Sequence, residues 1–256
     1  MKYISSLSGG AASAVAHARA MERYGKENVV AWFADTLWED DDLYRFLNDL
    51  EQYWQQKIIR HSEGLTPLQV AERQNIIPNQ KLAPCSQVLK QKPFKKFIEA
   101  YEKPVTVLLG LDWSEEHRMA TPKRVYESIS GVSVDFPLMW KPYDFDVFQT
   151  VRSWGIEIPR LYKMGFPHNN CGGRCVRQGV SEWQRLRVHF PERFANVRDW
   201  EAAQQAIGDA RSGYAICRDQ SNGEVKPLSL AEIEEREVSQ NVSAKQEDLF
   251  ACFCEF

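Results

Sequence analysis

A serine and two glycines near the start of the chain form a turn whose residue types suit phosphate binding. The turn, Ser8-Gly9-Gly10, follows a short predicted strand at 2–6 and precedes an alanine-rich stretch at 13–24 with helical character. Glycines let the backbone turn sharply and approach a ligand closely. The start of a helix adds unpaired N–H groups and the positive end of the helix dipole. The pattern therefore predicts a phosphate site; the alternative is a plain tight turn in which the serine caps the helix.

Polar residues also follow two later apolar runs. Asp35 and Thr36 come directly after the run at 29–34, and an acidic stretch at 39–42 then leads into a helical pattern. The run at 105–110 is followed by polar residues that include Asp112, Ser114, Glu115 and Arg118. Because parallel strands of an open α/β sheet present ligands at their carboxyl ends, we expect these side chains to line one crevice with the turn. The acidic stretch equally suits the preference of a helix N-terminus for negative charge.

The six cysteines fall partly into close pairs. Cys171 and Cys175 form a C-x3-C pair, and Cys252 and Cys254 form a C-x-C pair. Four thiolates suit zinc or an iron–sulfur cluster, and close pairs in a reducing compartment favour metal or redox chemistry over structural disulfides. The alternative is a set of buried cysteines that only pack.

These residues need a scaffold of strands and helices to position them. Apolar runs predict buried parallel strands at 29–34 and 105–110, and the segments at 2–6 and 57–60 are predicted as two further strands. Helical spacing falls between them. The predicted fold is therefore α/β, an open parallel sheet with helices on both faces. We expect an α/β domain at 1–136 and a mostly helical region at 137–256 that holds the cysteine metal site, because aromatic, proline-rich sequence begins at residue 137.

Composition excludes some classes of protein. The chain of 256 residues has a formal net charge of −3, which gives no general attraction to nucleic acid or anionic membranes. It contains no apolar run of the roughly 18 residues that a membrane span needs, and no signal-peptide pattern, so we expect a cytoplasmic protein without a membrane partner. Four lysines at 90–96 suit a solvated helix face or a cationic wall for phosphate.

Five segments, taken in order, resemble the PP-loop superfamily of adenine nucleotide α-hydrolase-like proteins. More narrowly, they resemble its phosphoadenosine phosphosulfate reductase-like branch of bacteria and phages. The segments are SGGAAS, FADTLWEDDDLYRF, CSQVLKQKPF, LGLDWSEEHR and LYKMGFPHNNCGGRC. The first resembles the family's SGG-x-D-S pyrophosphate loop and the second its D-T-G segment. The resemblance covers residues 1–190 and implies a Rossmann-like sheet.

The resemblance implies that ATP or a related adenine nucleotide binds at the turn. The nucleotide-binding residues that it implies are Ser6, Ser8, Gly9, Gly10, Ser13, Asp35, Thr36, Gly110 and Asp112. Ala12 stands where the family loop carries aspartate, so phosphate binding would rest on backbone N–H groups and the three serines. Asp112 stands where the family has arginine, which leaves Arg118 as the arginine of that segment.

The chemistry that the resemblance implies is attack on the α-phosphorus of ATP. Pyrophosphate would leave, an acceptor would be adenylylated, and Mg²⁺ near Asp35 would neutralise the departing charge. The catalytic candidates are Asp35, Lys90, Arg118 and Glu115, with the lysine and arginine as cationic stabilisers. By analogy with relatives, the resemblance implies an acceptor that is a small molecule or a nucleic-acid base and that receives sulfur or an amine in a later step.

Two alternatives of different kinds stand beside this reading. One is a thiol-dependent reductase of phosphoadenosine or adenosine phosphosulfate, with Cys252 or Cys254 as the nucleophile. The other is a non-catalytic nucleotide sensor, which the missing loop aspartate favours.

The resemblance also bears on the metal. It implies a four-iron–four-sulfur cluster held by Cys85, Cys171, Cys175 and one of the two C-terminal cysteines. Zinc held by Cys171, Cys175, Cys252 and Cys254 is the second choice. Ser86 stands where cluster-bearing reductases carry a second cysteine beside Cys85. A homodimer is left open.

Overall fold

The computed structural model describes residues 1–140, 145–219 and 224–239. The chain divides into two compact units. The first comprises residues 1–70 and 84–173, and the second comprises residues 71–83 and those from 174 onward. Cys252 and Cys254, which the sequence predicts as metal ligands, lie outside the described residues.

The first unit is built on a parallel sheet. In the described part of the chain its five strands are β1 (Lys2–Leu7), β2 (Val29–Asp35), β3 (Ile58–Ser62), β4 (Val105–Leu109) and β5 (Val132–Asp135). Their spatial order is β3-β2-β1-β4-β5, and every neighbouring pair is parallel. The strand order reverses between β1 and β4, which makes the carboxyl ends of these two strands the topological switch point where open sheets bind ligands. The predicted parallel α/β sheet is confirmed.

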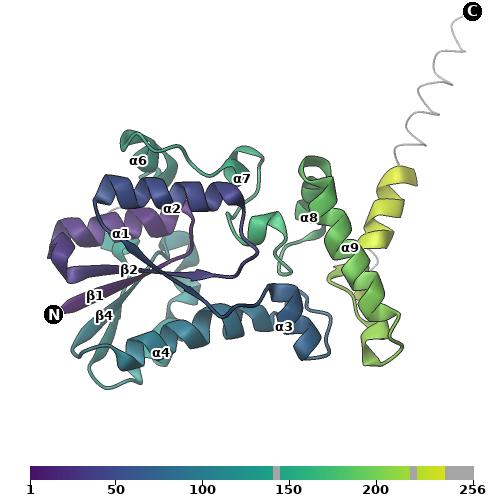
Figure 1. Cartoon of the computed structure of the whole chain (residues 1–256), viewed down its shortest axis with the longest axis horizontal. Coiled ribbons are helices and arrows are strands. Elements are labelled where there is room, and N and C mark those ends of the chain that lie inside the picture. Colours follow the sequence, from purple (N-terminus) through teal and green to yellow (C-terminus); the bar gives the residue numbers. More distant parts are fainter. Residues whose placement is uncertain (141–144, 220–223, 240–256) are drawn as a thin grey trace, which may run out of the picture. The chain divides into compact units, whose positions relative to one another are not determined.

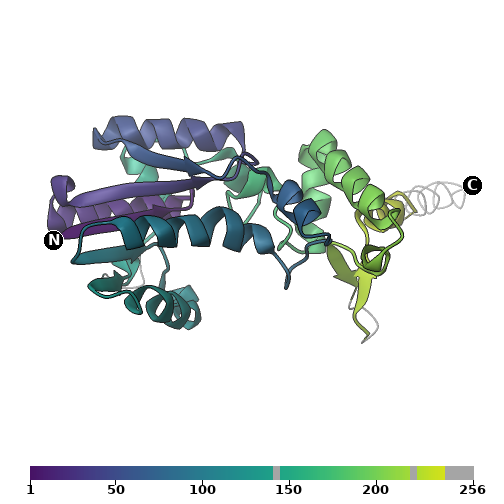
Figure 2. The same cartoon turned by 60° about the horizontal axis from the view of Figure 1, so that its bottom comes forward.

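Helices cover both faces of this sheet. Figure 1 shows α1 (Ala11–Tyr24) and α2 (Asp41–Trp54) on one side and α4 (Lys92–Ala100) on the other, and Figure 2 shows the strands between these layers from a second direction. The remaining helices of this unit and the segment that leads out of it are α3 (Pro67–Arg73), α5 (Ala120–Glu127), α6 (Val147–Ser153) and α7 (Arg160–Lys163). Short turns of 3-10 type join them, at η1 (Lys26–Asn28), η3 (Trp113–Arg118), η4 (Pro137–Trp140) and η5 (Cys171–Gly173).

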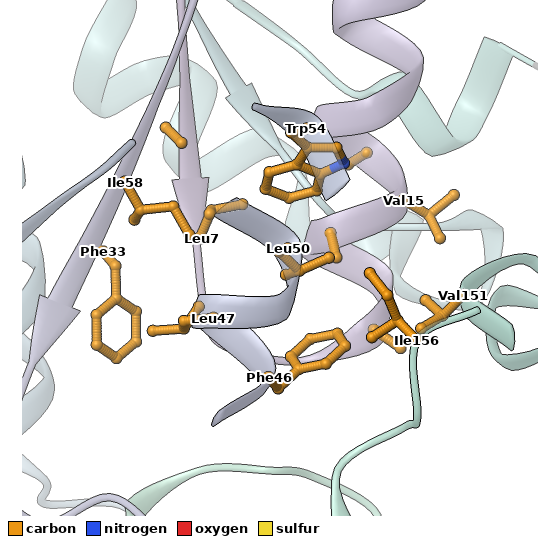
Figure 3. Close-up of a cluster of buried hydrophobic side chains, with 14 of the residues drawn as sticks. Leu7, Val15, Phe33, Phe46, Leu47, Leu50, Trp54, Ile58, Val151 and Ile156 are labelled. Atoms are coloured by element: carbon orange, nitrogen blue, oxygen red, sulfur yellow. The ribbon is translucent and has the colours of Figure 1, made fainter. Parts of the chain in front are cut away.

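The helical spacing of apolar residues in α2 explains how one face is filled. Phe46, Leu47 and Leu50 recur at intervals of three and four, so they share one side of the helix. Figure 3 shows them beside Leu7 and Phe33, which point from β1 and β2 toward the helices. Side chains alternate across a strand, so the residue that precedes each of these two on its own strand faces the opposite layer.

The opposite face carries its own core. Trp32 of β2 and Val107 of β4 pack there with Phe94 and Ile98 of α4. Phe94 lies 4.8 Å from Trp32 between ring centroids. Burial of aromatic and aliphatic side chains on both faces is the main stabilising term for such a sheet, and it fixes the strand ends that form the candidate site.

The helix at 84–100 differs in detail from the sequence prediction. Pro93 suggests an interruption or a restart, yet the structure continues from a π-helix, η2 (Ser86–Gln91), directly into α4. Proline lacks an N–H, so it is tolerated in the first turn of α4, where no intrahelical donor is required. The change from π-helical to α-helical hydrogen bonding therefore falls immediately before Pro93. π-Helical segments of this kind are frequent at functional sites.

The segment after residue 136 packs with the sheet. Val151, Ile156 and Ile158 belong to the same hydrophobic cluster as Leu7 and Phe33. Residues 137–173 therefore lie in the first compact unit, whereas the sequence pattern suggests a boundary at residue 137. The change in composition there reflects a layer that covers α1 and α2.

The second unit contains helices and a small antiparallel strand pair. Its helices include α8 (Val180–His189) and α9 (Pro191–Gln205), with η6 (Ala210–Gly213) after them. Strands β6 (Cys217–Asp219) and β7 (Lys226–Leu228) pair antiparallel, a feature that the polar sequence there did not predict. Trp183 and Phe194 are fully buried where α8 and α9 meet.

Within the described residues, no helix combines the length and the apolar character that crossing a membrane requires.

Candidate functional site

The turn after β1 lies at the switch point and is closed by Ser13. The Ser13 hydroxyl oxygen accepts hydrogen bonds from the backbone N–H of Ser8 and from the Ser8 hydroxyl, both at 3.1 Å. It donates to the carbonyl of Gly10 at 2.9 Å. Gly9 has a φ of 78°, a conformation that glycine adopts without steric penalty. The predicted residues Ser8, Gly9, Gly10 and Ser13 are thus brought together in one compact loop, while Ser6 lies within β1.

The first turn of α1 offers N–H groups at this loop. Gly10 is the N-cap of the helix and has no side chain to accept from them. Phosphate oxygens are natural acceptors for such groups, because the helix dipole adds positive potential at the same point. The loop therefore has the chemistry of an anion site.

Two residues from much later in the chain contact this loop. The side chain of Asn169 is buried, and its Nδ2 donates to the carbonyl of Gly9 at 2.9 Å. The hydroxyl of Tyr162 lies so close to Gly10 that a Cβ placed there would be 2.6 Å from it. Burial raises the pKa of Tyr162, and the backbone N–H groups of Ala11 and Asn169 partly oppose that shift. The segment after α7 therefore fixes the loop from one side.

The end of β4 fixes the loop from the other side. A Cβ on Gly110 would lie 2.8 Å from the Cα of Ser13, so only glycine permits this approach. Close backbone packing of this kind is a recognised reason for glycine. The predicted site residue Gly110 thus contributes by leaving room for the first turn of α1 beside the Ser8–Ser13 turn.

Asp35 ends β2, the strand beside β1. Its Oδ1 accepts from the backbone N–H of Leu37 at 2.9 Å and from the hydroxyl of Tyr44 at 2.8 Å. Burial raises the pKa of Tyr44, with the Asp35 carboxylate adding to the shift, so the phenol stays a donor. Among the described residues Asp35 Oδ2 accepts no hydrogen bond, and this oxygen suits a hard cation such as Mg²⁺.

Glu39 joins three elements through one carboxylate. Its side chain is only 1% exposed. Oε1 accepts from the hydroxyl of the fully buried Thr36 at 2.8 Å and lies 3.7 Å from the ammonium of Lys90. Oε2 accepts from the backbone N–H of Cys171 at 2.5 Å. The predicted residues Thr36 and Lys90 are therefore brought together with the cysteine turn by a residue that the sequence had not singled out.

The polar residues after β4 lie on η3. Asp112 caps this short helix, and its Oδ1 accepts from the N–H of Ser114 at 2.9 Å. Arg118 is exposed and forms an ion pair with Glu115. The structure thus places the two catalytic candidates Glu115 and Arg118 in contact with each other, in the segment that follows β4.

The described cysteines do not gather into a metal site. Cys85 stands at the N-terminus of η2, Cys171 is buried at the start of η5, and Cys175 belongs to the second unit. Cys217 is buried in β6, and burial raises the pKa of its thiol to about 12, which fits a packing role. Among the described residues no three His, Cys, Asp or Glu side chains are placed to hold a metal ion. His168, three residues before Cys171, is an exposed loop residue.

Three residues of the site, Glu39, Tyr162 and Asn169, were missed by sequence reasoning. A signal for Glu39 existed, because Thr36 and Glu39 have the T-x-x-E spacing at which a hydroxyl and a carboxylate can pair locally. Its neighbour Asp40 does cap α2, accepting from the N–H of Asp42, so the helix-charge interpretation holds for Asp40. Tyr162 and Asn169 gave no local signal, because their partners lie some 150 positions earlier in the chain.

Comparison with known proteins gives three findings. A family model described as the phosphoadenosine phosphosulfate reductase domain matches residues 2–174. An uncharacterized protein of Methanocaldococcus jannaschii is 27% identical over 210 residues, which is 79% of this chain and 42% of the relative. The chain thus spans less than half the length of that relative.

Among solved structures, a crystal structure of phosphoadenylyl-sulfate reductase from Candida auris, in a phosphate complex, is similar with a TM-score of 0.47 and 15% identity. The similarity covers 66% of this chain and 81% of that one. The family match begins at β1 and runs through the turn and the sheet to residue 174, just past Cys171. On that match, the chain belongs to the phosphoadenosine phosphosulfate reductase domain family.

Proposed function

We propose that this chain is an enzyme that binds ATP or a related adenine nucleotide at the Ser8–Ser13 turn and acts at its α-phosphate. The observation that carries the proposal is the position of the turn. It joins the carboxyl end of β1 to an α1 whose N-cap has no side chain, at the switch point of the sheet. Membership of the family supports an adenine nucleotide and sulfur-related chemistry.

In the proposed reaction, a nucleophilic atom of the acceptor forms a bond to the α-phosphorus. The bond from that phosphorus to the bridging oxygen breaks, and the electron pair leaves with pyrophosphate. The N–H groups of the α1 first turn would hold phosphate oxygens, and the Ser8 hydroxyl would turn from Ser13 Oγ to join them. Asp35 Oδ2 would hold the Mg²⁺ that neutralises these oxygens. The acceptor is proposed to be a small molecule or a nucleic-acid base.

Two cationic residues would stabilise developing negative charge. Lys90 lies beside the end of β2, where the buried carboxylate of Glu39 is 3.7 Å from it. Arg118 lies after β4, where its ion pair with Glu115 is exposed to solvent. An exposed pair of this kind contributes little energy, so the arginine can exchange its partner for a phosphate at little cost.

The family match itself favours a second candidate, a thiol-dependent reductase of an adenylyl sulfate. In that reaction a cysteine thiolate attacks the sulfur of the sulfonyl group, the adenine nucleotide leaves with the bridging oxygen, and a thiol reductant releases sulfite. Cys252 and Cys254 are the proposed nucleophiles, and both lie outside the described residues.

The two reactions give different products. We expect purified protein with ATP, Mg²⁺ and a trial acceptor to release pyrophosphate, and adenylyl sulfates with thioredoxin to give no sulfite. Sulfite formation without pyrophosphate would instead establish the reductase. Asp35→Asn should abolish pyrophosphate release, while the exposed neighbour Asp41→Asn serves as the matched control.

A cysteine-held metal is a separate proposal. The four-iron–four-sulfur cluster requires Cys85, Cys171, Cys175 and one of the C-terminal cysteines, and zinc requires both C-terminal cysteines. The described cysteines alone do not fit either site, so no step of the reaction is assigned to a metal cluster. Iron, sulfide and zinc analysis after anaerobic purification separates the choices: iron with a visible absorption band indicates the cluster, and one zinc in a colourless protein indicates zinc.

A further inference from the structure

The carboxylate of Glu39 is almost completely buried at the edge of the sheet that carries the turn. Glu39 lies in the connection that follows the carboxyl end of β2, and the hydroxyl of Thr36 donates to it from three residues earlier in the chain. A buried carboxylate is stable only where donors or a cation compensate for lost hydration. Here the compensation comes from two distant elements, η2 through Lys90 and η5 through Cys171.

The hydrogen bond from the Cys171 N–H to Glu39 is made by a residue with an unusual backbone conformation. Cys171 has a φ of 54°, in the left-handed region that non-glycine residues rarely adopt. Gly172 and Gly173 continue this left-handed turn with φ values of 58° and 79°. Such a conformation persists only where surrounding structure fixes it. The Glu39 Oε2 contact to the Cys171 N–H, at 2.5 Å, supplies that restraint.

The contact to Lys90 has a different character. The ammonium lies 3.7 Å from Oε1, which is an ionic contact, longer than a hydrogen bond. The lysine side chain is 34% exposed whereas the glutamate is 1% exposed. The carboxylate is therefore held in the interior, and the partly exposed lysine ammonium lies within its attraction.

We propose that Glu39 is a positioning residue that sets both the Lys90 ammonium and the backbone of Cys171 at the carboxyl end of β2. The Lys90 half of this inference rests on the proposed nucleotide function, and the Cys171 half does not. Glu39 touches neither nucleotide nor acceptor in this account. It acts by keeping a cation and a cysteine turn at the same strand end as Asp35 and Thr36.

A double-mutant cycle tests the Lys90 half. Lys90→Met should weaken ATP binding about tenfold or more, the usual effect of losing a charge-assisted contact. Glu39→Gln keeps the side-chain shape but removes the charge, and should weaken binding less. The double variant should bind no worse than Lys90→Met alone, because the glutamate acts through the lysine. Additive losses, or unchanged binding in Glu39→Gln, would overturn this half.

Alkylation of Cys171 by iodoacetamide, mapped by mass spectrometry, tests the other half. Glu39→Gln should increase the labelling rate about fivefold or more, since a restraint on local opening is lost. The exposed-site control Asp41→Asn should leave the rate unchanged. Thr36→Val, which keeps the carboxylate but removes one donor, should give a smaller increase and serves if Glu39→Gln does not fold. An unchanged rate in both Glu39→Gln and Thr36→Val would overturn this half.

If the wild-type chain binds no ATP, the proposed nucleotide function and the Lys90 half fail together. The labelling result then still decides the link between Glu39 and Cys171. If ATP binds and Lys90→Met has no effect, the assigned role of Lys90 is wrong and the nucleotide site stands.

Discussion

At the residue scale, Ser13 sets the form of the turn after β1. Its oxygen accepts from Ser8 twice, and its proton goes to the Gly10 carbonyl. This serine is buried and stands beside Ala12, where the related loops carry an aspartate. One hydroxyl therefore closes the loop without adding negative charge, and the N–H groups of the α1 first turn keep their positive potential for an anion.

Ser13→Ala tests this role. Loss of the hydroxyl leaves the Ser8 N–H without its acceptor, so we expect a destabilisation of about 1 kcal/mol and a clear loss of ATP affinity. Urea unfolding and calorimetric titration with ATP measure the two effects. The control is Ser153→Ala, whose exposed hydroxyl donates to the Thr150 carbonyl on α6. Equal ATP affinities in the two variants would remove Ser13 from the site.

At the element scale, the β1–α1 connection depends on how closely α2 packs against it. Gly9 and Gly155 both have positive φ, at 78° and 75°. A Cβ on Gly9 would lie 2.6 Å from Leu43 Cδ1, whereas a Cβ on Gly155 would meet nothing within 4 Å. Substitution of either glycine by alanine would therefore strain the backbone, but only at Gly9 would the added methyl group also collide with a neighbouring side chain.

Gly155→Ala should lower the free energy of unfolding by about 1 kcal/mol through backbone strain alone. Gly9→Ala should lower it by a further 1 kcal/mol or more, roughly, because Leu43 in the α2 core must move. Only Gly9→Ala should also weaken ATP binding. Denaturant titrations of both variants, with and without ATP, provide the measurement, and matching losses of stability would contradict the packing argument.

The sequence predicted the long elements and missed the short ones for a physical reason. The apolar run at 29–34 reads as a covered strand because both of its faces are buried, and β2 is found there. In β5, Ser133 is exposed between buried valines, and β6 and β7 are three residues each. Strands this short contain too few residues to show a period.

The candidate site divides in the same way. Local pattern was enough for the turn at Ser8 and for Asp35, because chain neighbours create both features. The contacts of Glu39 with Lys90 and Cys171 join residues separated by some 50 to 130 positions. No periodicity in one segment records such pairs, so they appear only once the chain is folded.

At the scale of the whole molecule, each compact unit contains a buried titratable group, and the two groups make stability depend on pH in opposite directions. In the first unit, burial lowers the pKa of His17 to about 4, although Gln56 hydrogen-bonds to its ring. In the second unit, burial raises the pKa of Glu201 to about 7, against the two backbone N–H groups of Ile216 and Leu230. Each shift of 2 to 3 pH units corresponds to about 3 kcal/mol.

The signs give opposite pH dependences. Between pH 6.5 and 4 only the unfolded chain protonates His17, so the first unit loses stability as pH falls. Between pH 4.5 and 7 the unfolded chain ionises Glu201 while the folded chain keeps the proton, so the second unit loses stability as pH rises. Proteolysis in urea at several pH values, with fragments mapped by mass spectrometry, should show this crossing. Parallel trends in both units would contradict it.

A crystal structure with ATP and Mg²⁺ tests the central claim most directly. The account predicts the triphosphate against the N–H groups that open α1, with the metal at Asp35 and the Lys90 ammonium turned toward the phosphates. Nucleotide bound elsewhere on the chain, with the Ser8–Ser13 loop unchanged and in contact only with Tyr162 and Asn169, would contradict it.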